Sequence, residues 1–254
     1  MIHPTALVDP GAHLGRDVSV GPYAVIEADT EIGDGCTIAA HAVIKRYTRM
    51  GAANRIAEFA VIGGEPQDFK FKDCPSCVVI GAGNRIGEGV TIHRSNHEGG
   101  ETRLGDDNFL MAMSHVAHDC QLGNRVILAN GALLGGHVEV GDRAFVSGAV
   151  TVHQFCRIGR MALVAASSRV NQDCLPFMIA DGNPARTRAL NVVGLRRAGV
   201  DAADIAALRR ALHRLRTQTA QAELLTALEA DTSAAVRELA AFIRTTKRGY
   251  AHCR

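Results

Sequence analysis

An aliphatic residue returns at every sixth position over the first two-thirds of the chain. Counting from Ile2 to Val170 in steps of six, only Asp68, Cys74 and Glu98 among 29 positions are not aliphatic. This period fits neither the 3.6 residues of a helical turn nor the two-residue alternation of ordinary strands. The repeat itself is therefore the structural unit, and we expect a hexapeptide solenoid in which each hexad supplies one short strand.

Three hexads make one triangular coil, and successive coils stack at about 4.8 Å, the spacing of hydrogen-bonded strands. The residue four places after each aliphatic one is usually small or of modest size, as at Ala24, Cys120 and Ala162. Small residues there let the chain turn its corners tightly. We therefore predict an all-β parallel β-helix over residues 1–182.

The period changes after Gly182-Asn183-Pro184, where helical spacing begins. A cap at Asp201 starts the first predicted helix, and the last is capped near Ser233 and ended by Gly249. The aliphatic faces of the three helices are Ile205, Leu208, Leu212 and Leu215; Leu224, Leu225 and Leu228; and Val236, Leu239, Phe242 and Ile243. Residues 183–254 are thus expected to form a small C-terminal α-helical domain that folds back on the last coils.

Two interruptions of the hexads lie at residues 63–79 and 93–103. Both keep the six-residue phase, so the coils on either side can continue to stack while the loops project outward. Projecting loops on a rigid scaffold commonly carry binding groups.

With 254 residues and 47% hydrophobic content, the chain has enough apolar material for one elongated domain and a smaller one. It shows no charged leader followed by an apolar run, and no stretch approaches 18 consecutive apolar residues, so neither export nor a membrane span is expected. Cys74 and Cys77 form a lone CxxC, which is weak support for zinc. Four other cysteines occupy small inward positions and are expected to be reduced, as in a cytoplasmic protein: Cys36, Cys120, Cys156 and Cys174.

Charged residues are distributed unevenly along the chain. Residues 1–182 carry a net charge of −5, whereas residues 183–254 carry +7. Arg210 and Arg214 lie four apart and are expected on one exposed face of the first helix. An acidic protein partner docking there is the interpretation we favour over a merely solvated surface, and no nucleic-acid partner is expected.

The repeat also predicts which histidines are close together in the folded chain. Val116, Leu134 and Val152 differ by 18 and so stack one coil apart. The histidines next to them therefore gather with one carboxylate along one edge of three coils: His115, His118, Asp119, His137 and His153. We expect a functional site there.

Two chemistries suit this column. A neutral histidine such as His118, oriented by Asp119, can accept a proton from an attacking hydroxyl, and the exposed backbone of Gly135-Gly136 can hold an oxyanion. Alternatively, three histidines can hold zinc, as in hexapeptide-repeat carbonic anhydrases.

Several segments together resemble the family that transfers an acyl chain from acyl carrier protein to UDP-N-acetylglucosamine, the O-acyltransferase step that begins lipid A synthesis in Gram-negative bacteria. The resemblance spans nearly the whole chain. The segments that carry it are Gln67-Asp68-Phe69-Lys70, Thr91-Ile92-His93-Arg94, the stretch from Ser114 to Cys120, Gly123-Asn124-Arg125, Gly135-Gly136-His137, Val152-His153-Gln154-Phe155 and the stretch from Gly194 to Arg197.

This resemblance implies a left-handed β-helix and a homotrimer with sites between subunits. His118 would be the general base, Asp119 its partner and Gly136 the oxyanion donor. No cofactor and no metal would be required. The remaining implied site residues are Asp68, Lys70, His93, His115, His137, His153 and Gln154 for the substrate, Asn191 and Arg197 for the nucleotide, and Met161, Leu163 and Ala166 for the acyl groove.

The chain departs from the family in the nucleotide segment, where Val193 stands for a Glu and Ala198 for a second Arg. At the end of the expected acyl groove, Ala166 stands where some members have Gly, which would shorten the accepted chain. Two alternatives remain open: transfer to a 3-amino sugar nucleotide, giving an amide, and a metal-dependent lyase of the carbonic anhydrase type.

Overall fold

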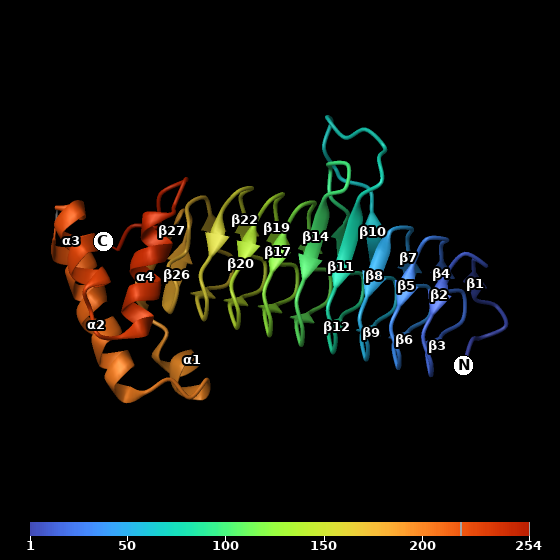
Figure 1. Cartoon of the computed structure of the whole chain (residues 1–254), viewed down its shortest axis with the longest axis horizontal. Helices are drawn as coiled ribbons and strands as arrows, with labels where there is room; N and C mark the ends of the chain where they lie inside the picture. The colour runs from blue at the N-terminus through green and yellow to red at the C-terminus, as the bar shows by residue number, and fades with distance from the viewer. Residues whose placement is uncertain (219, 254) are drawn as a thin grey trace.

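The computed structural model describes residues 1–218 and 220–253, and within these ranges the chain forms a long solenoid with helices at its C-terminal end (Figure 1). Strands of successive coils pair in parallel. Val25 pairs with Val43 and His115 with Leu133, both at the 18-residue offset that the hexads predict. The parallel β-helix is therefore confirmed.

Each side of the triangular coil is one sheet, and its strands run parallel except for the last strand of the third sheet. The first sheet contains β1 (Leu7–Val8), β4 (Val25–Ile26), β7 (Val43–Ile44), β10 (Val61–Gly64), β13 (Thr91–His93), β16 (His115–Val116), β19 (Leu133–Leu134), β22 (Thr151–Val152) and β25 (Arg169–Val170). The second contains β2 (His13–Leu14), β5 (Glu31–Ile32), β8 (Thr48–Met50), β11 (Cys77–Ile80), β14 (Glu101–Leu104), β17 (Gln121–Leu122), β20 (Glu139–Val140) and β23 (Arg157–Ile158). The third contains β3 (Ser19–Val20), β6 (Thr37–Ile38), β9 (Arg55–Ile56), β12 (Arg85–Ile86), β15 (Phe109–Leu110), β18 (Ile127–Leu128), β21 (Phe145–Val146), β24 (Leu163–Val164), β26 (Met178–Gly182) and β27 (Ala185–Leu190).

The in-phase aliphatic residues fill the interior of the coils. Ile26, Ile62 and Leu110 are at most 1% exposed. Many of the corner residues three places after them have a positive φ, including Asp119 at 62° and His137 at 59°. The small residue that follows each corner is buried in most coils, as Cys120 is. The tight corners expected from these small positions are thus confirmed.

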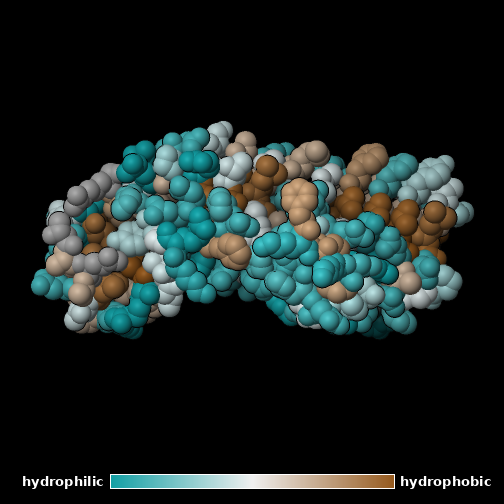
Figure 2. All heavy atoms as spheres, turned by 90° about the horizontal axis from the view of Figure 1, so that it is seen from above, coloured by the Kyte–Doolittle hydropathy of each residue, from teal (hydrophilic) through white to brown (hydrophobic). Residues whose placement is uncertain are grey.

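The two interruptions form loops that project from the coils, as Figure 1 shows above β10 and β14. Ile62 of β10 pairs with Ile92 of β13, and Ile92 pairs with Val116 of β16, so the stacking continues across both insertions. Seen from the side of the loops, the middle of the molecule is mainly hydrophilic, whereas apolar side chains are visible over the N-terminal coils (Figure 2).

The C-terminal part begins with the antiparallel pair β26 and β27, followed by α1 (Val192–Arg197), α2 (Ala202–Thr217), α3 (Gln221–Glu229) and α4 (Ala234–Arg244). Asp201 and Ser233 cap α2 and α4 as predicted. Three details were wrong. Strand β27 and the short helix α1 were not foreseen, and α4 ends at Arg244 instead of extending to Gly249.

Two hydrophobic cores hold these parts together. One fills the solenoid, and the other joins the helices. The second core also takes in Met161, Leu175, Phe177 and Met178 from the last coils. Because these residues precede the expected boundary at 182, the division into residues 1–182 and 183–254 stays a prediction. In the described ranges, every helix falls short of the length and apolar character that crossing a bilayer requires.

Candidate active site

A cavity of about 450 Å³ lies against three stacked coils of the first sheet and is here called the histidine cavity. Its walls combine imidazoles, glycine backbone and a residue from the first projecting loop. The lining residues are Gln67, His93, His115, Ala117, His118, Leu133, Leu134, Gly135, Gly136, Thr151, Val152, His153 and Gln154.

His118 and Asp119 form a pair at the corner that follows β16. The Nδ1 atom of His118 lies 2.8 Å from Oδ2 of Asp119, and both side chains are 11% exposed. The backbone N–H of Asp119 donates to Oγ1 of Thr102 at 2.7 Å, which holds the left-handed corner in place. The corner thus turns the carboxylate back toward the neighbouring imidazole.

The carboxylate of Asp119 is also held from its other side. Ser95 Oγ donates to Oδ1 at 2.5 Å, and the backbone N–H of Asn96 donates to Oδ2 at 3.2 Å. Burial opposes ionisation, but the hydrogen bonds from His118, Ser95 and Asn96 outweigh it and lower the pKa of Asp119 to about 2. An ionised carboxylate only accepts hydrogen bonds, so it selects the tautomer of His118 that carries its proton on Nδ1 and leaves Nε2 as an acceptor.

Gly136 lies directly against this acceptor nitrogen. A Cβ atom at position 136 would be 2.6 Å from Nε2 of His118 and 2.5 Å from its Cε1. Within the described residues, the backbone N–H of Gly136 donates to no protein acceptor. Glycine at this position therefore lets the imidazole of His118 lie close to the backbone of residue 136, so that a proton acceptor and a free N–H donor belong to the same cavity wall.

His93 and His115 line the cavity beside His118. Their rings meet edge to face with centroids 4.8 Å apart, and Nδ1 of His115 is 2.7 Å from Oγ1 of Thr91. Burial, with the nearby His115 and His118, lowers the pKa of His93 to about 4, and burial also lowers the pKa of His115. Both rings are therefore neutral at pH 7. The buried Nδ1 of His93 has no hydrogen-bond partner within the described residues.

His137 lies one coil above Asp119 and its ring is perpendicular to that of His118, with centroids 5.2 Å apart. It stacks on Phe155, the next residue in the same column, at 4.5 Å. His137 does not line the histidine cavity but a neighbouring cavity of about 650 Å³, together with Lys247 and Arg248. Burial lowers the pKa of His137, although the charge of Asp119 opposes this shift. The column of histidines is thus confirmed as a spatial cluster.

The first projecting loop approaches the same cluster. Asp68 accepts a hydrogen bond from the Asn96 side chain at 3.1 Å, and Asn96 in turn contacts Asp119. The N–H of Lys70 donates to Asp68, whose pKa is lowered by this bond, while the Lys70 side chain is exposed. Of this loop, Gln67 lines the cavity itself.

Asn191 and Arg197 are not among the residues that line the histidine cavity. Asn191 is 6% exposed, and both of its polar atoms are used within the fold. Oδ1 accepts from the N–H of Gly194, which caps α1, and Nδ2 donates to the carbonyl of Met161 at 2.9 Å. Arg197 is exposed at the end of α1.

The three residues expected in the acyl groove differ in their surroundings. Met161 is 6% exposed and packs in the core of the helices, where it contributes to the fold. Leu163 is half-buried in β24, and Ala166 is exposed. Met161 therefore does not present a groove surface within one chain, and a groove over Leu163 and Ala166 stays a prediction.

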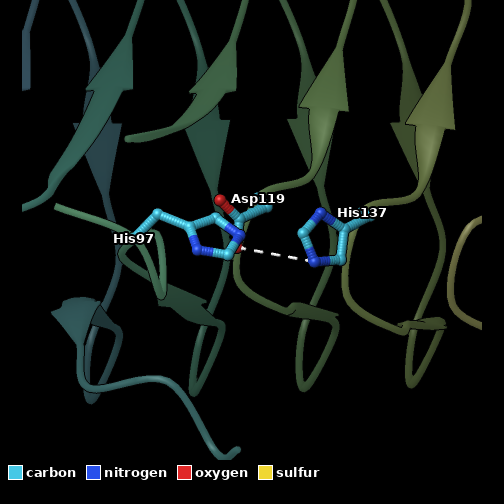
Figure 3. A group of neighbouring side chains, drawn as sticks. All are labelled: His97, Asp119 and His137. Atoms are coloured by element: carbon cyan, nitrogen blue, oxygen red, sulfur yellow. Dashed lines mark ion pairs between the residues drawn. The ribbon is translucent and has the colours of Figure 1, made fainter. Parts of the chain in front are cut away.

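Sequence reasoning missed the residues that support Asp119, namely Ser95, Asn96 and Thr102. All belong to the second projecting loop or the strand after it. The position of the second loop beside the histidine column was the signal in the sequence that pointed to these residues. The residues themselves follow no motif. His97 was also missed, and it groups with Asp119 and His137 (Figure 3).

The comparisons with known proteins agree with this geometry. A profile described as bacterial transferase hexapeptide (six repeats) matches residues 2–46 and 101–136, and one described as UDP N-acetylglucosamine O-acyltransferase, domain 2, matches residues 173–251. The chain is 55% identical over 261 residues to the acyl-(acyl-carrier-protein)–UDP-N-acetylglucosamine O-acyltransferase of Cupriavidus taiwanensis, covering 98% of both proteins. It is 47% identical over 256 residues to the enzyme of that name from Paraburkholderia phytofirmans, again covering 98% of both.

The structure of UDP-N-acetylglucosamine acyltransferase from Campylobacter jejuni matches with a TM-score of 0.95 and 41% identity, covering 100% of both chains. Fold and site thus define a hexapeptide-repeat transferase with a left-handed parallel β-helix and a small helical domain. More specifically, the chain belongs to the UDP-N-acetylglucosamine O-acyltransferase family. The comparisons do not favour the lyase that the sequence left open.

Proposed function

We propose that this protein transfers an (R)-3-hydroxyacyl chain from acyl carrier protein to the 3-hydroxyl of the glucosamine in UDP-N-acetylglucosamine, the first step of lipid A biosynthesis. The observation that carries the proposal is the arrangement at His118. Its Nδ1 is bound to an ionised carboxylate, and its Nε2 lies against Gly136, whose backbone N–H donates to no acceptor among the described residues. This arrangement supplies the base and the oxyanion donor that acyl transfer requires.

The reaction follows from the tautomer that Asp119 selects. Nε2 of His118 removes the proton from the sugar 3-hydroxyl as the oxygen attacks the thioester carbonyl. The resulting imidazolium is stabilised by the carboxylate 2.8 Å from Nδ1. The N–H of Gly136 donates to the oxyanion of the tetrahedral intermediate. Collapse of that intermediate breaks the carbon–sulfur bond, and the departing thiolate takes the proton from Nε2.

The other cavity residues are proposed to position the substrates. His93, His115, His153 and Gln154 line the cavity, and neutral imidazoles offer both a donor and an acceptor to sugar hydroxyls. Asp68 and Lys70 belong to the loop whose Gln67 lines the cavity, and the ring of His137 lies beside that of His118. All three are proposed to complete the binding of the substrate.

The nucleotide contact is proposed to involve Arg197, which is exposed and can pair with phosphate. A contact between Asn191 and the nucleotide would compete with the two hydrogen bonds that the Asn191 side chain makes inside the fold. A role in positioning α1, and with it Arg197, agrees better with those bonds.

We also propose a homotrimer with its sites in the clefts between subunits, and docking of acidic acyl carrier protein on the basic C-terminal region. Arg209 and Arg210 of α2 are exposed and Arg214 is half-buried. A cytoplasmic location is proposed because all seven cysteines are free thiols.

The proposal is tested by incubating the protein with UDP-N-acetylglucosamine, its 3-amino analogue and 3-hydroxyacyl carrier proteins of several lengths, and identifying the products by mass. We expect an ester at the 3-position and no turnover in His118→Ala, with the assembly unchanged by light scattering. An amide formed in preference to the ester would favour the 3-amino acceptor. Full turnover in His118→Ala would remove His118 from its role.

A further inference from the structure

We propose that His97, Asp119 and His137 bind one zinc ion, and that this ion inhibits acyl transfer. Each residue offers a ligand atom that lies within 4.8 Å of the other two (Figure 3). Zinc binding by these three residues does not depend on the reaction proposed above, whereas the inhibition rests on that proposed function.

Two of the three ligands are fixed by the solenoid. Asp119 and His137 occupy the same corner of consecutive coils, both with the left-handed backbone of that corner. Oδ2 of Asp119 lies 3.8 Å from Nε2 of His137. The stacking of His137 on Phe155 holds the imidazole plane, so that Nε2 is directed toward the carboxylate as Figure 3 shows.

The third ligand is brought in by the second projecting loop. Ser95 is fully buried, and its hydroxyl joins the N–H of His97, at 3.1 Å, to Oδ1 of Asp119. Gly100 is required for this arrangement, because a Cβ atom there would come within 2.2 Å of Oγ of Ser95. The loop backbone is therefore tied to Asp119, and the exposed imidazole of His97 lies over the carboxylate.

The donor set suits zinc. Two imidazole nitrogens and one carboxylate oxygen, with a position left for water, form a common tetrahedral zinc environment. With metal–ligand bonds of about 2.0–2.2 Å, ligand atoms lie about 3.3 Å apart. The separation of 3.8 Å between Asp119 and His137 is close to this value, and rotation of the exposed His97 side chain closes the remainder.

Zinc at this site would compete with the catalytic pair. Oδ2 of Asp119, the oxygen nearest to His137, is also the atom bound to Nδ1 of His118. A cation bound to Oδ2 neutralises the negative charge of the Asp119 carboxylate and adds positive charge beside the His118 ring. The imidazolium formed during proton transfer then loses its stabilisation, so turnover falls.

Binding is tested by calorimetric titration of zinc into chelator-treated full-length protein, and by the visible absorption of the cobalt-substituted protein. We expect one zinc per wild-type chain and binding weaker by about 10- to 100-fold or more in His97→Ala and in His137→Ala. His41→Ala, which removes an exposed histidine from an N-terminal coil, is the matched control and should bind as the wild type does. Equal affinity in wild type and His97→Ala would overturn the site.

Inhibition is tested by assaying each variant relative to its own zinc-free rate. Zinc should inhibit the wild type and His41→Ala, chelator should restore the rate, and His97→Ala should require at least about tenfold more zinc, matching its loss of affinity. Stoichiometric zinc binding without loss of turnover would overturn the inhibitory role. If the zinc-free protein shows no acyl transfer, the proposed function fails, while the titration still decides whether the site exists.

Discussion

A Cβ atom added to Gly136 would lie 2.6 Å from Nε2 of His118, closer than real Cβ contacts occur. The absence of a side chain at position 136 thus allows the imidazole of the proposed base to take its present position. The two residues belong to adjacent coils, because Leu134 pairs with Val116 at the 18-residue offset. The site therefore depends on the stacking of the coils as much as on the imidazole.

Gly136→Ala is expected to lower kcat by about 10²- to 10³-fold, because the methyl group displaces His118 and obstructs the N–H that would hold the oxyanion. Steady-state kinetics and the unfolding midpoint should be measured together. Gly148→Ala is the matched control, since its Cβ would meet only the carbonyl of Asn130 at 3.4 Å. Normal kcat in Gly136→Ala would exclude the proposed oxyanion site.

Arg94 is expected to hold the first projecting loop in place. Its side chain is 2% exposed, donates to the carbonyl of Cys74 and to Asp73, and lies 5.0 Å from the ring centroid of Phe71. Arg94→Met should reduce the free energy of unfolding by about 1.5–3 kcal/mol through the loss of charge-assisted hydrogen bonds. KM for the sugar nucleotide should rise, because the loop carries Asp68 and Lys70.

Arg46→Met provides the control for this variant. Arg46 contacts the same carboxylate, Asp73, at 2.9 Å but is exposed, so its loss should lower the free energy of unfolding much less than the loss of Arg94 does. Denaturant unfolding and substrate titration distinguish the two variants. Equal effects of both substitutions would show that burial of Arg94 does not stabilise the loop.

The stability of the fold should fall on acidification below pH 6.5. The pKa of His93 is about 4 in the folded protein and near 6.5 in the unfolded chain, so the unfolded state binds more protons between these values. The contribution of neutral His93 is fully present above pH 6.5 and lost as the pH falls toward 4. At about 1.4 kcal/mol per pKa unit, the loss is on the order of 3 kcal/mol.

His93→Gln removes this titration and should flatten the decrease between pH 6.5 and 4. Unfolding midpoints measured across this range for both proteins give the comparison. A variant whose stability declines as steeply as that of the wild type would assign the acid sensitivity to other groups.

Reversing the charge of Arg210 and Arg214 to Glu should raise KM for the acyl carrier protein by about tenfold or more and leave KM for the sugar nucleotide nearly unchanged, because the carrier is the acidic partner. The effect should diminish with added salt. Arg55→Glu with Arg85→Glu reverses two exposed charges in β9 and β12 and serves as the control. An equal rise in both KM values would count against docking on α2.

Much of the fold follows from local sequence. A six-residue period with aliphatic residues inside and small residues after the corners is a property of each hexad, so the coils and their vertical neighbours could be predicted. That geometry brings His118, Gly136 and Gln154 to one cavity wall. The caps at Asp201 and Ser233 are equally local.

Contacts between segments that are distant in the chain could not be predicted from local sequence. Ser95 and Asn96 reach Asp119 only because an inserted loop folds against the next coil, and Asn191 is drawn inside by the carbonyl of Met161. These bonds join residues 23 to 30 positions apart, and no repeat specifies them. The hexad period thus established the scaffold and the row of histidines, whereas the packing of the inserted loop against Asp119 established which nitrogen of His118 is free. The reason is that a tautomer depends on an ionised partner and its hydrogen bonds, which exist only in the folded chain.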